Sequence, residues 1–189
     1  MKTIAITGSI GSGKSTVTKL IAKKYFTQSC DEINKRLLYE SEAVREAFPE
    51  CVSDGEIDRA LLAAKVFSSA DERKRLEGIM HPLILKEIKE KLKEHESDRY
   101  CFVEVPLLFE AHWEIYFDES LLVVTDLDHL YERLLRDRKM SVEEITKRLD
   151  SQMDVTKKMR LADHLIFNNG TYEELEAKVS QFLYELEAK

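Results

Sequence analysis

A lysine and a serine follow a glycine-rich turn near the start of the chain, in an arrangement that could hold phosphate. Residues 8–15 read GSIGSGKS, which matches G-x-x-x-x-G-K-[ST] at every fixed position. Glycines let the backbone aim its N–H groups at phosphate oxygens, and the following helix adds the positive end of its dipole. We expect Lys14 to reach the β- and γ-phosphates of a nucleotide and the Ser15 hydroxyl to bind Mg²⁺. The alternative is a chance match in a glycine-rich turn.

The acceptor of that phosphate needs a carboxylate near the loop, and Asp31 is the candidate. It follows a weak strand pattern, YFTQS at 25–29, and so lies at the carboxyl end of a strand, where α/β sheets gather their ligands. There it could orient and deprotonate an acceptor hydroxyl. The competing interpretation is that Asp31 only caps the following helix.

Short apolar runs that are typical of buried strands position these residues, and a helical pattern follows each run. The runs are TIAIT, YCFVEV, SLLVVT and HLIF, at residues 3–7, 100–105, 120–125 and 164–167. This alternation predicts a doubly wound parallel α/β sheet. Capping boxes predict two helix starts, at Ser141–Glu144 and Thr171–Glu174. The second of these helices should pack an apolar face on the sheet.

The spacing of the elements predicts a core with two helical additions. Residues 40–97 are mostly helical and longer than a simple crossover needs. His81-Pro82 should interrupt this insertion, because proline disfavours helical geometry in the residue before it. Residues 136–160 form a basic helical segment, which we expect to act as a lid over the phosphates. The nucleotide-binding core would comprise the remainder, 1–39, 98–135 and 161–189.

Composition and charge disfavour several classes of protein. The 189 residues carry a formal net charge of −7, which argues against broad nucleic-acid binding because that requires a basic surface. No apolar run approaches the roughly 20 residues of a membrane span, and no signal-peptide pattern opens the chain, so we expect a cytoplasmic protein without membrane contact. Three widely spaced cysteines without a C-x-x-C pair indicate reduced thiols. We expect a monomer or a weak homo-oligomer with small-molecule partners.

The phosphate loop alone fits GTPases, ATPase motors, transporters and small-molecule kinases. Neither N-K-x-D nor L-S-G-G-Q occurs in the sequence, which disfavours GTPases and transporter ATPases. A small chain with a basic helical segment favours a kinase, because phosphoryl transfer needs cations around the transferred group and exclusion of water. The alternatives are a nucleoside-monophosphate kinase and a non-catalytic ATP-binding regulatory protein.

Five segments together resemble the dephospho-coenzyme A kinase family of P-loop kinases. They are TGSIGSGKST at 7–16, D-E-I at 31–33, HPLI at 81–84, VPLLFE at 105–110 and ADHLIFNNG at 162–170. The resemblance covers nearly the whole chain. It implies phosphorylation of the ribose 3′-hydroxyl of dephospho-coenzyme A with ATP and Mg²⁺, giving coenzyme A and ADP. It also implies a nucleotide-binding core, a helical acceptor-binding insertion and a helical lid.

The resemblance further implies roles for individual residues. Asp31, Lys14 and Arg136 would be catalytic. The nucleotide would contact Gly11, Ser12, Gly13, Lys14, Ser15, Thr16, Arg138 and Asn169, the last of these near the adenine. The acceptor would contact Asp31, His81, Pro82, Pro106, Leu107, Leu108 and Glu110. Ordinary structural roles compete with these assignments: His81 could end a helix, the turn at 106–108 could be apolar packing, and the arginines could be solvated helix charges.

One departure from the family pattern concerns the metal. The family commonly shows D-x-D where this chain has Ser29-Cys30-Asp31, so the first carboxylate is absent. If that carboxylate helps to hold Mg²⁺ through water, either Ser29 does less or Glu104, at the end of its strand, contributes. The second aspartate, which the resemblance makes the base, is retained.

Overall fold

A computed structural model describes residues 1–188, and its contacts divide the chain into two units. The first unit contains Met1–Ser29 and the chain from His95 onward, and the second contains Cys30–Glu94. The helical unit therefore begins earlier than the expected residue 40. The physical reason is that helix α2 (Cys30–Glu40) packs against helix α5 (Ala70–Glu94) of the same unit. Within the described residues, no helix is long and apolar enough to cross a membrane.

A five-stranded parallel sheet in the order β2-β5-β1-β6-β7 forms the centre of the first unit. Its strands are β1 (Lys2–Gly8), β2 (Phe26–Ser29), β5 (Tyr100–Glu104), β6 (Glu119–Val124) and β7 (His164–Phe167). Strands β1, β5 and β6 are almost entirely buried, as parallel strands covered on both faces must be. The predicted α/β class and all five predicted strands are confirmed.

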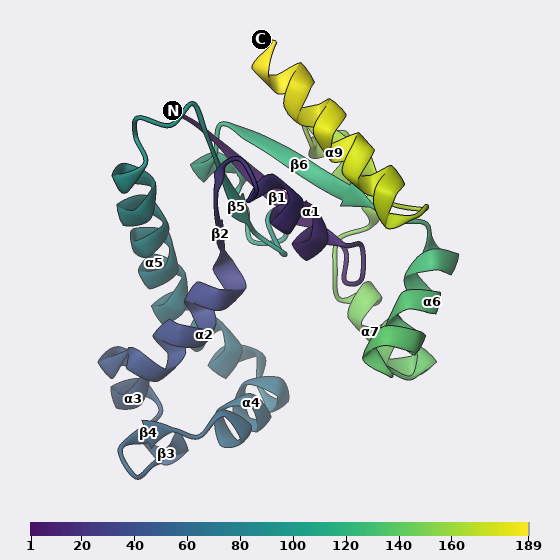
Figure 1. Cartoon of the computed structure of the whole chain (residues 1–189). Helices are drawn as coiled ribbons and strands as arrows, with labels where there is room; N and C mark the ends of the chain where they lie inside the picture. The colour runs from purple at the N-terminus through teal and green to yellow at the C-terminus, as the bar shows by residue number, and fades with distance from the viewer. Residues whose placement is uncertain (189) are drawn as a thin grey trace. The chain divides into compact units, whose positions relative to one another are not determined.

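Helices α1 (Lys14–Ile21) and α9 (Tyr172–Glu187) pack side by side on this sheet (Figure 1). Their apolar side chains join those of β1, β5 and β6 in one core. The predicted capping box between Thr171 and Glu174 is present at the start of α9. The predicted apolar face of α9 is buried in that core, through Leu175, Val179, Phe182, Leu183 and Leu186.

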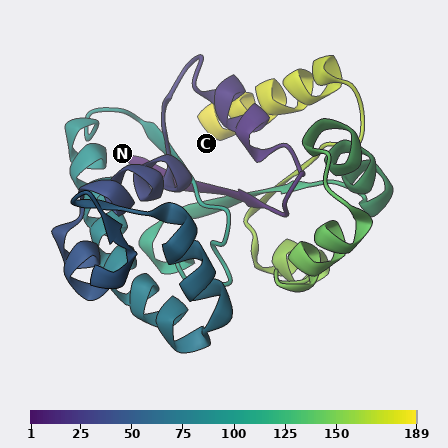
Figure 2. The same cartoon turned by 90° about the horizontal axis from the view of Figure 1, so that it is seen from below.

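Three helices connect β6 to β7. They are α6 (Leu127–Arg138), α7 (Val142–Asp150) and α8 (Val155–Leu161), and Figure 2 shows them in green, gathered at one end of the strands. Helix α7 begins at the predicted capping box, in which the Ser141 hydroxyl accepts from the Glu144 N–H and the Glu144 carboxylate from the Ser141 N–H. The segment that we expected to be a lid therefore consists of α7, α8 and the end of α6.

The second unit is helical, with one short hairpin. It contains α2, α3 (Glu42–Ala47), a 3₁₀ turn at Pro49–Cys51, a hairpin of β3 (Val52–Ser53) and β4 (Glu56–Ile57), α4 (Arg59–Ser68) and α5. The expected interruption at His81-Pro82 is wrong, because α5 continues through Pro82. A proline inside a helix costs about 3 kcal/mol. Here α5 packs against α2, α3 and α4, and Gly78, whose carbonyl loses its partner, is exposed to water.

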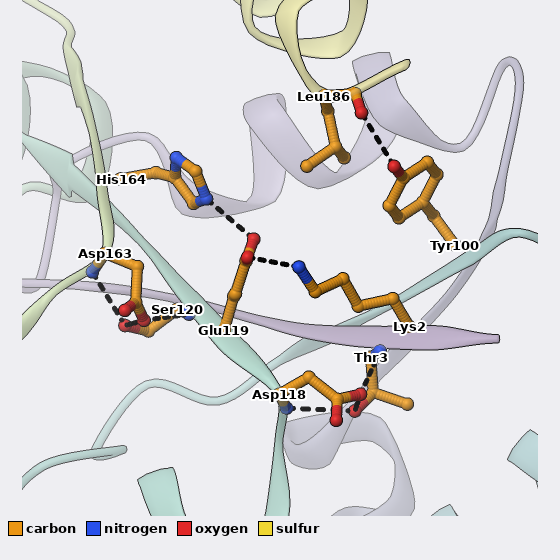
Figure 3. A network of polar contacts seen from close by, with 9 residues as sticks. All are labelled: Lys2, Thr3, Tyr100, Asp118, Glu119, Ser120, Asp163, His164 and Leu186. Carbon is orange, nitrogen blue, oxygen red and sulfur yellow. Dashed lines mark hydrogen bonds and ion pairs between the residues drawn. The ribbon is translucent and has the colours of Figure 1, made fainter. Parts of the chain in front are cut away.

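Polar contacts connect the amino ends of β1, β6 and β7 (Figure 3). The phosphate loop follows the opposite, carboxyl end of β1. Glu119 accepts from Lys2 Nζ and contacts His164 Nε2 at 2.8 Å. Burial opposes ionisation of Glu119, but the hydrogen bonds from Lys2 and His164 outweigh it, so the pKa of this carboxyl is lowered. In the same region Asp118 accepts from Thr3 and Asp163 from Ser120, each through the backbone N–H and the hydroxyl.

We expect the Glu119 contacts to give the fold a pH dependence in acid. A carboxyl whose folded pKa is lowered stabilises the fold above its unfolded pKa of about 4.3, and this stability is lost as the pH falls through the folded pKa. Glu119→Gln should lower the free energy of unfolding at pH 7 by about 1.5–3 kcal/mol, the range for hydrogen bonds to charged groups. Urea unfolding of wild type and variant at pH 7 and pH 3 measures this difference. Glu96→Gln, at an exposed position, is the control, and an equal difference at both pH values would contradict the expectation.

Candidate active site

The phosphate loop joins β1 to α1, and two of its glycines have backbone conformations that other residues rarely adopt. Gly11 has a φ of 77° and Gly13, the N-cap residue of α1, a φ of 94°. A Cβ atom on Gly13 would lie 2.2 Å from Asn168 Nδ2. Glycine is therefore required at position 13 by the backbone conformation and by the lack of space.

A cavity of about 390 Å³ opens above this loop. Its lining combines the loop and α1 with the end of α6 and the start of α9. The lining residues are Gly11, Gly13, Lys14, Ser15, Thr16, Arg133, Leu134, Arg136, Asp137, Arg138, Asn168, Gly170, Thr171, Tyr172 and Leu175. The loop residues that we predicted to bind nucleotide thus line one cavity with both predicted lid arginines, except for Ser12, which is buried and does not line it.

Lys14 is held by the loop itself. Its ammonium donates to the carbonyl oxygens of Gly8 and Ser9, at 2.8 and 2.9 Å. These contacts place a positive charge at the cavity, where the phosphates of a bound nucleotide would carry negative charge.

The shape of the loop depends on residues at the ends of β6 and β7. The Ser12 carbonyl accepts from Thr125 Oγ1 at 3.0 Å and from Asn168 Nδ2 at 2.8 Å. The Arg133 guanidinium donates to the Asn168 carbonyl at 2.8 Å. Thr125, Asn168 and Ser12 are all buried. Thr125 and Asn168 thus fix the loop at the Ser12 carbonyl, and Arg133 in turn holds Asn168.

Sequence reasoning gave no role to Arg133 or Asn168. A signal was available for each of them. Asn168 is the first asparagine of the segment ADHLIFNNG, and Arg133 lies one helical turn before Arg136, on the same face of α6. The sequence pattern directed the prediction to Asn169 and Arg136, whereas Asn168 makes the contact with the loop and Arg133 holds Asn168.

Arg136, one of the two predicted lid cations, and Asn169 have partners within the protein. Arg136 is 66% exposed and contacts Asp137 at 2.7 Å and Glu132 at 3.6 Å, and the Asp137 contact raises the pKa of its guanidinium. Asn169 Oδ1 accepts from the Asp126 N–H at 2.9 Å, at the start of α6. Its neighbours in sequence, Asn168 and Gly170, line the cavity. A contact between Asn169 and the adenine stays a prediction.

Ser15 and Glu104 bring oxygen atoms together beside the loop. The Ser15 hydroxyl donates to Glu104 Oε1 at 3.1 Å, and Glu104 is only 7% exposed. Ser29, at the end of β2, is the register partner of Glu104. Hydroxyl and carboxylate oxygens are ligands that suit Mg²⁺. Among residues 1–188, no cluster of three or more His, Cys, Asp or Glu could hold a metal alone, so Mg²⁺ here would also need phosphate oxygens and water.

The predicted acceptor turn follows β5. The Pro106 carbonyl accepts from Thr7 Oγ1 at 3.2 Å, which attaches the turn to β1. Leu108 is fully buried and Leu107 is about half exposed. Glu110 forms an ion pair with Lys158 at 2.7 Å. The turn is therefore partly a packing element, and Leu107 is its exposed apolar side chain.

The other acceptor residues belong to the helical unit. Asp31 is the second residue of α2, which begins directly after β2, and it is exposed. Because the helix begins at Cys30, Asp31 lies inside the first turn and does not precede the helix. A carboxylate in the first turn is favoured by the helix dipole, so a structural role is available to it. His81 and Pro82 lie in the middle of α5.

The parallel sheet, the loop with Lys14 and Ser15, and the arginines around one cavity together define a P-loop phosphotransferase of the α/β class. The model of the dephospho-CoA kinase family matches residues 2–174. The chain belongs to this family.

Individual relatives agree with that assignment. The dephospho-CoA kinase of Wolinella succinogenes is 36% identical over 185 residues, which cover 95% of this chain and 92% of that protein. A crystal structure of a Thermus thermophilus protein is 36% identical, covers 98% of this chain and 97% of its own, and has a TM-score of 0.87. The dephospho-CoA kinase structure from Campylobacter jejuni is 27% identical, with coverages of 97% and 96% and a TM-score of 0.75.

Proposed function

We propose that this chain transfers the γ-phosphoryl group of ATP to the ribose 3′-hydroxyl of dephospho-coenzyme A, giving coenzyme A and ADP. The observation that carries the proposal is the family match over residues 2–174. The cavity above the phosphate loop supports it, because it combines phosphate-binding backbone with cationic side chains. We place the reaction in the cytoplasm, in a monomer or a weak homo-oligomer.

In this proposal the loop and α6 bind and stabilise the phosphates. The backbone N–H groups of Gly11–Thr16 and the Lys14 ammonium hold the β- and γ-phosphates, and Arg136 and Arg138 add positive charge from α6. Charge on the transferred group spreads over its equatorial oxygens during transfer, so fixed cations around it lower the barrier. Arg133 keeps the loop in shape through Asn168 and adds a third guanidinium to the cavity wall.

Ser15 and Glu104 are the residues that would hold Mg²⁺. A bound Mg²⁺ would neutralise negative charge on the phosphates. Glu104 is a buried carboxylate on the Ser15 hydroxyl, so it supplies the negative charge that Ser29, its register partner, lacks. This role for Glu104 answers the departure from the family's D-x-D pattern.

Asp31 acts on the acceptor in this proposal. Its carboxylate orients the ribose 3′-hydroxyl and accepts its proton as the bond to phosphorus forms. We assign contacts with the rest of the acceptor to His81, Pro82 and the turn after β5, where Leu107 offers an exposed apolar side chain. Leu108 is buried and therefore contributes to the packing of the turn.

The substrate assignment is tested by measuring ADP release with a panel of acceptors. We expect kcat/KM for dephospho-coenzyme A to exceed that for each nucleoside monophosphate by at least about 10²-fold, because a site built to pair with a substrate's polar groups rejects analogues that lack them. Comparable turnover of a nucleoside monophosphate would favour the alternative kinase. A single-turnover experiment that binds ATP but yields no phosphorylated acceptor would favour a regulatory protein. The same assay without Mg²⁺ should show no turnover above background, and metal-independent turnover would overturn the metal assignment.

A further inference from the structure

The junction between α7 and α8 contacts two separate parts of the first unit. Gln152 Oε1 accepts from the Ile10 N–H at 3.1 Å, on the phosphate loop. The next residue, Met153, donates its N–H to Glu110 Oε1 at 2.9 Å, beyond the turn after β5. Two consecutive residues of the lid segment are therefore attached, one to the loop and one to Glu110.

Glu110 is itself held by a buried charge. Lys158, in α8, is fully buried, and its ammonium lies 2.7 Å from Glu110 Oε1, while the Glu110 side chain is 17% exposed. A buried ammonium must be paired, so Lys158 and Glu110 keep each other in place. The pair attaches α8 to the segment after β5, on the far side of the junction from α7.

An apolar contact attaches the lid to the same loop residue. Ile10 packs against a small core formed by Leu130 and Leu134 of α6 and Ile145 of α7. Ile10 is thus fixed through its backbone by Gln152 and through its side chain by α6 and α7. A displacement of the α7–α8 junction would disturb both contacts and, through α6, the arginines in the cavity wall.

We propose that Glu110 is a positioning residue for the nucleotide. It holds the α7–α8 junction through Met153 and Lys158, so that Gln152 supports the phosphate loop at Ile10 and the lid helices stay packed on it. In this role Glu110 acts through Gln152 and touches neither substrate. The competing role is direct contact with the acceptor, which the family resemblance implies. A positioning role predicts a change in the nucleotide Kd, and direct contact predicts a change in the acceptor KM.

The test removes the ion pair without leaving a buried charge unpaired. The double variant Glu110→Leu/Lys158→Met replaces both partners with apolar groups of similar size, a change that buried ion pairs often tolerate. It is compared with Gln152→Leu, with the triple variant and with Ser151→Ala, an exposed neighbour in the same junction. The readouts are the Kd of a fluorescent ATP analogue, the KM for dephospho-coenzyme A and the thermal unfolding midpoint.

We expect the double variant and Gln152→Leu each to raise the nucleotide Kd by about tenfold, because each loses the linkage between the α7–α8 junction and the phosphate loop. The acceptor KM should stay within about twofold of the wild-type value. In the triple variant the nucleotide Kd should also rise by no more than about tenfold over wild type, because both sets of substitutions break the same linkage. Ser151→Ala should match wild type. The proposal is overturned if the acceptor KM rises while the nucleotide Kd stays unchanged, or if the two effects on nucleotide multiply. If the double variant fails to fold, Glu110→Gln takes its place. A rise in its nucleotide Kd alone would support the proposal, and a rise in its acceptor KM alone would overturn it.

Discussion

Lys14→Ala is expected to reduce kcat by about 10²–10³-fold or more at saturating ATP, the cost of removing one preorganised electrostatic contact to a developing charge. Its ammonium donates to the carbonyls of Gly8 and Ser9, and Lys14 lines the cavity. In the proposed complex it compensates charge on the transferring phosphoryl group. Because Lys14 is partly exposed and lies at a ligand site, the thermal unfolding midpoint should change little.

Lys19→Ala is the matched control for this experiment. Lys19 lies on the same helix, α1, and is exposed, so the variant removes a lysine without touching the cavity. Its kcat should equal that of wild type. If Lys14→Ala retains near wild-type turnover at saturating ATP, the lysine does not act on the transferred group and the assignment fails.

Asp31→Asn is expected to reduce kcat by about 10²-fold while stability is retained, at the lower end of the usual 10²–10⁴ range for general-base catalysis. Loose phosphoryl-transfer transition states need little early deprotonation, so orientation of the hydroxyl should supply most of the effect. Asparagine keeps much of the shape of aspartate and removes its charge. The measurement combines steady-state kinetics with dephospho-coenzyme A and thermal unfolding.

The structural role of Asp31 forecasts a different result. A carboxylate in the first turn of a helix is worth about 0.3–1 kcal/mol through the helix dipole, so its loss would lower stability slightly and leave kcat unchanged. Glu32→Gln provides the comparison, because Glu32 occupies the same turn of α2 and is also exposed. An unchanged kcat in Asp31→Asn would rule out a role on the acceptor. A loss of turnover confined to Asp31→Asn, with equal stability of both variants, is the expected outcome.

The strands were predictable because burial on both faces leaves continuous apolar runs in the sequence. Strand β2 was the weakest prediction, since all four of its residues are only partly buried at the sheet edge. The helices with capping boxes were predictable from local hydrogen bonding. The continuous helix through Pro82 was not, because tertiary packing of α5 overrides a local preference that the sequence states correctly.

The candidate site, like the fold, was predictable only in part. The phosphate loop is a contiguous motif, and its residues could be identified before any contact was known. The support of that loop is not contiguous. Asn168 and Gln152 bond it from distant segments, and Arg133 acts only through Asn168, so no spacing rule in the sequence connects these partners. Lys158 is a further case, because a lysine in a basic segment is normally solvated, whereas here it is fully buried on Glu110.

The position of β1 at the centre of the sheet has a consequence for the synthesis of the chain. Strand β1 is synthesised before both of its partners in the sheet, β5 and β6, so it cannot pair until they follow. The hydrogen bonds that support the phosphate loop form later still, since the Ser12 carbonyl accepts from Thr125 and Asn168, which follow it by 113 and 156 residues. Such non-local contacts form late in folding. Nascent chains that end before Asn168 should therefore lack the finished nucleotide site, although they already contain the complete loop sequence.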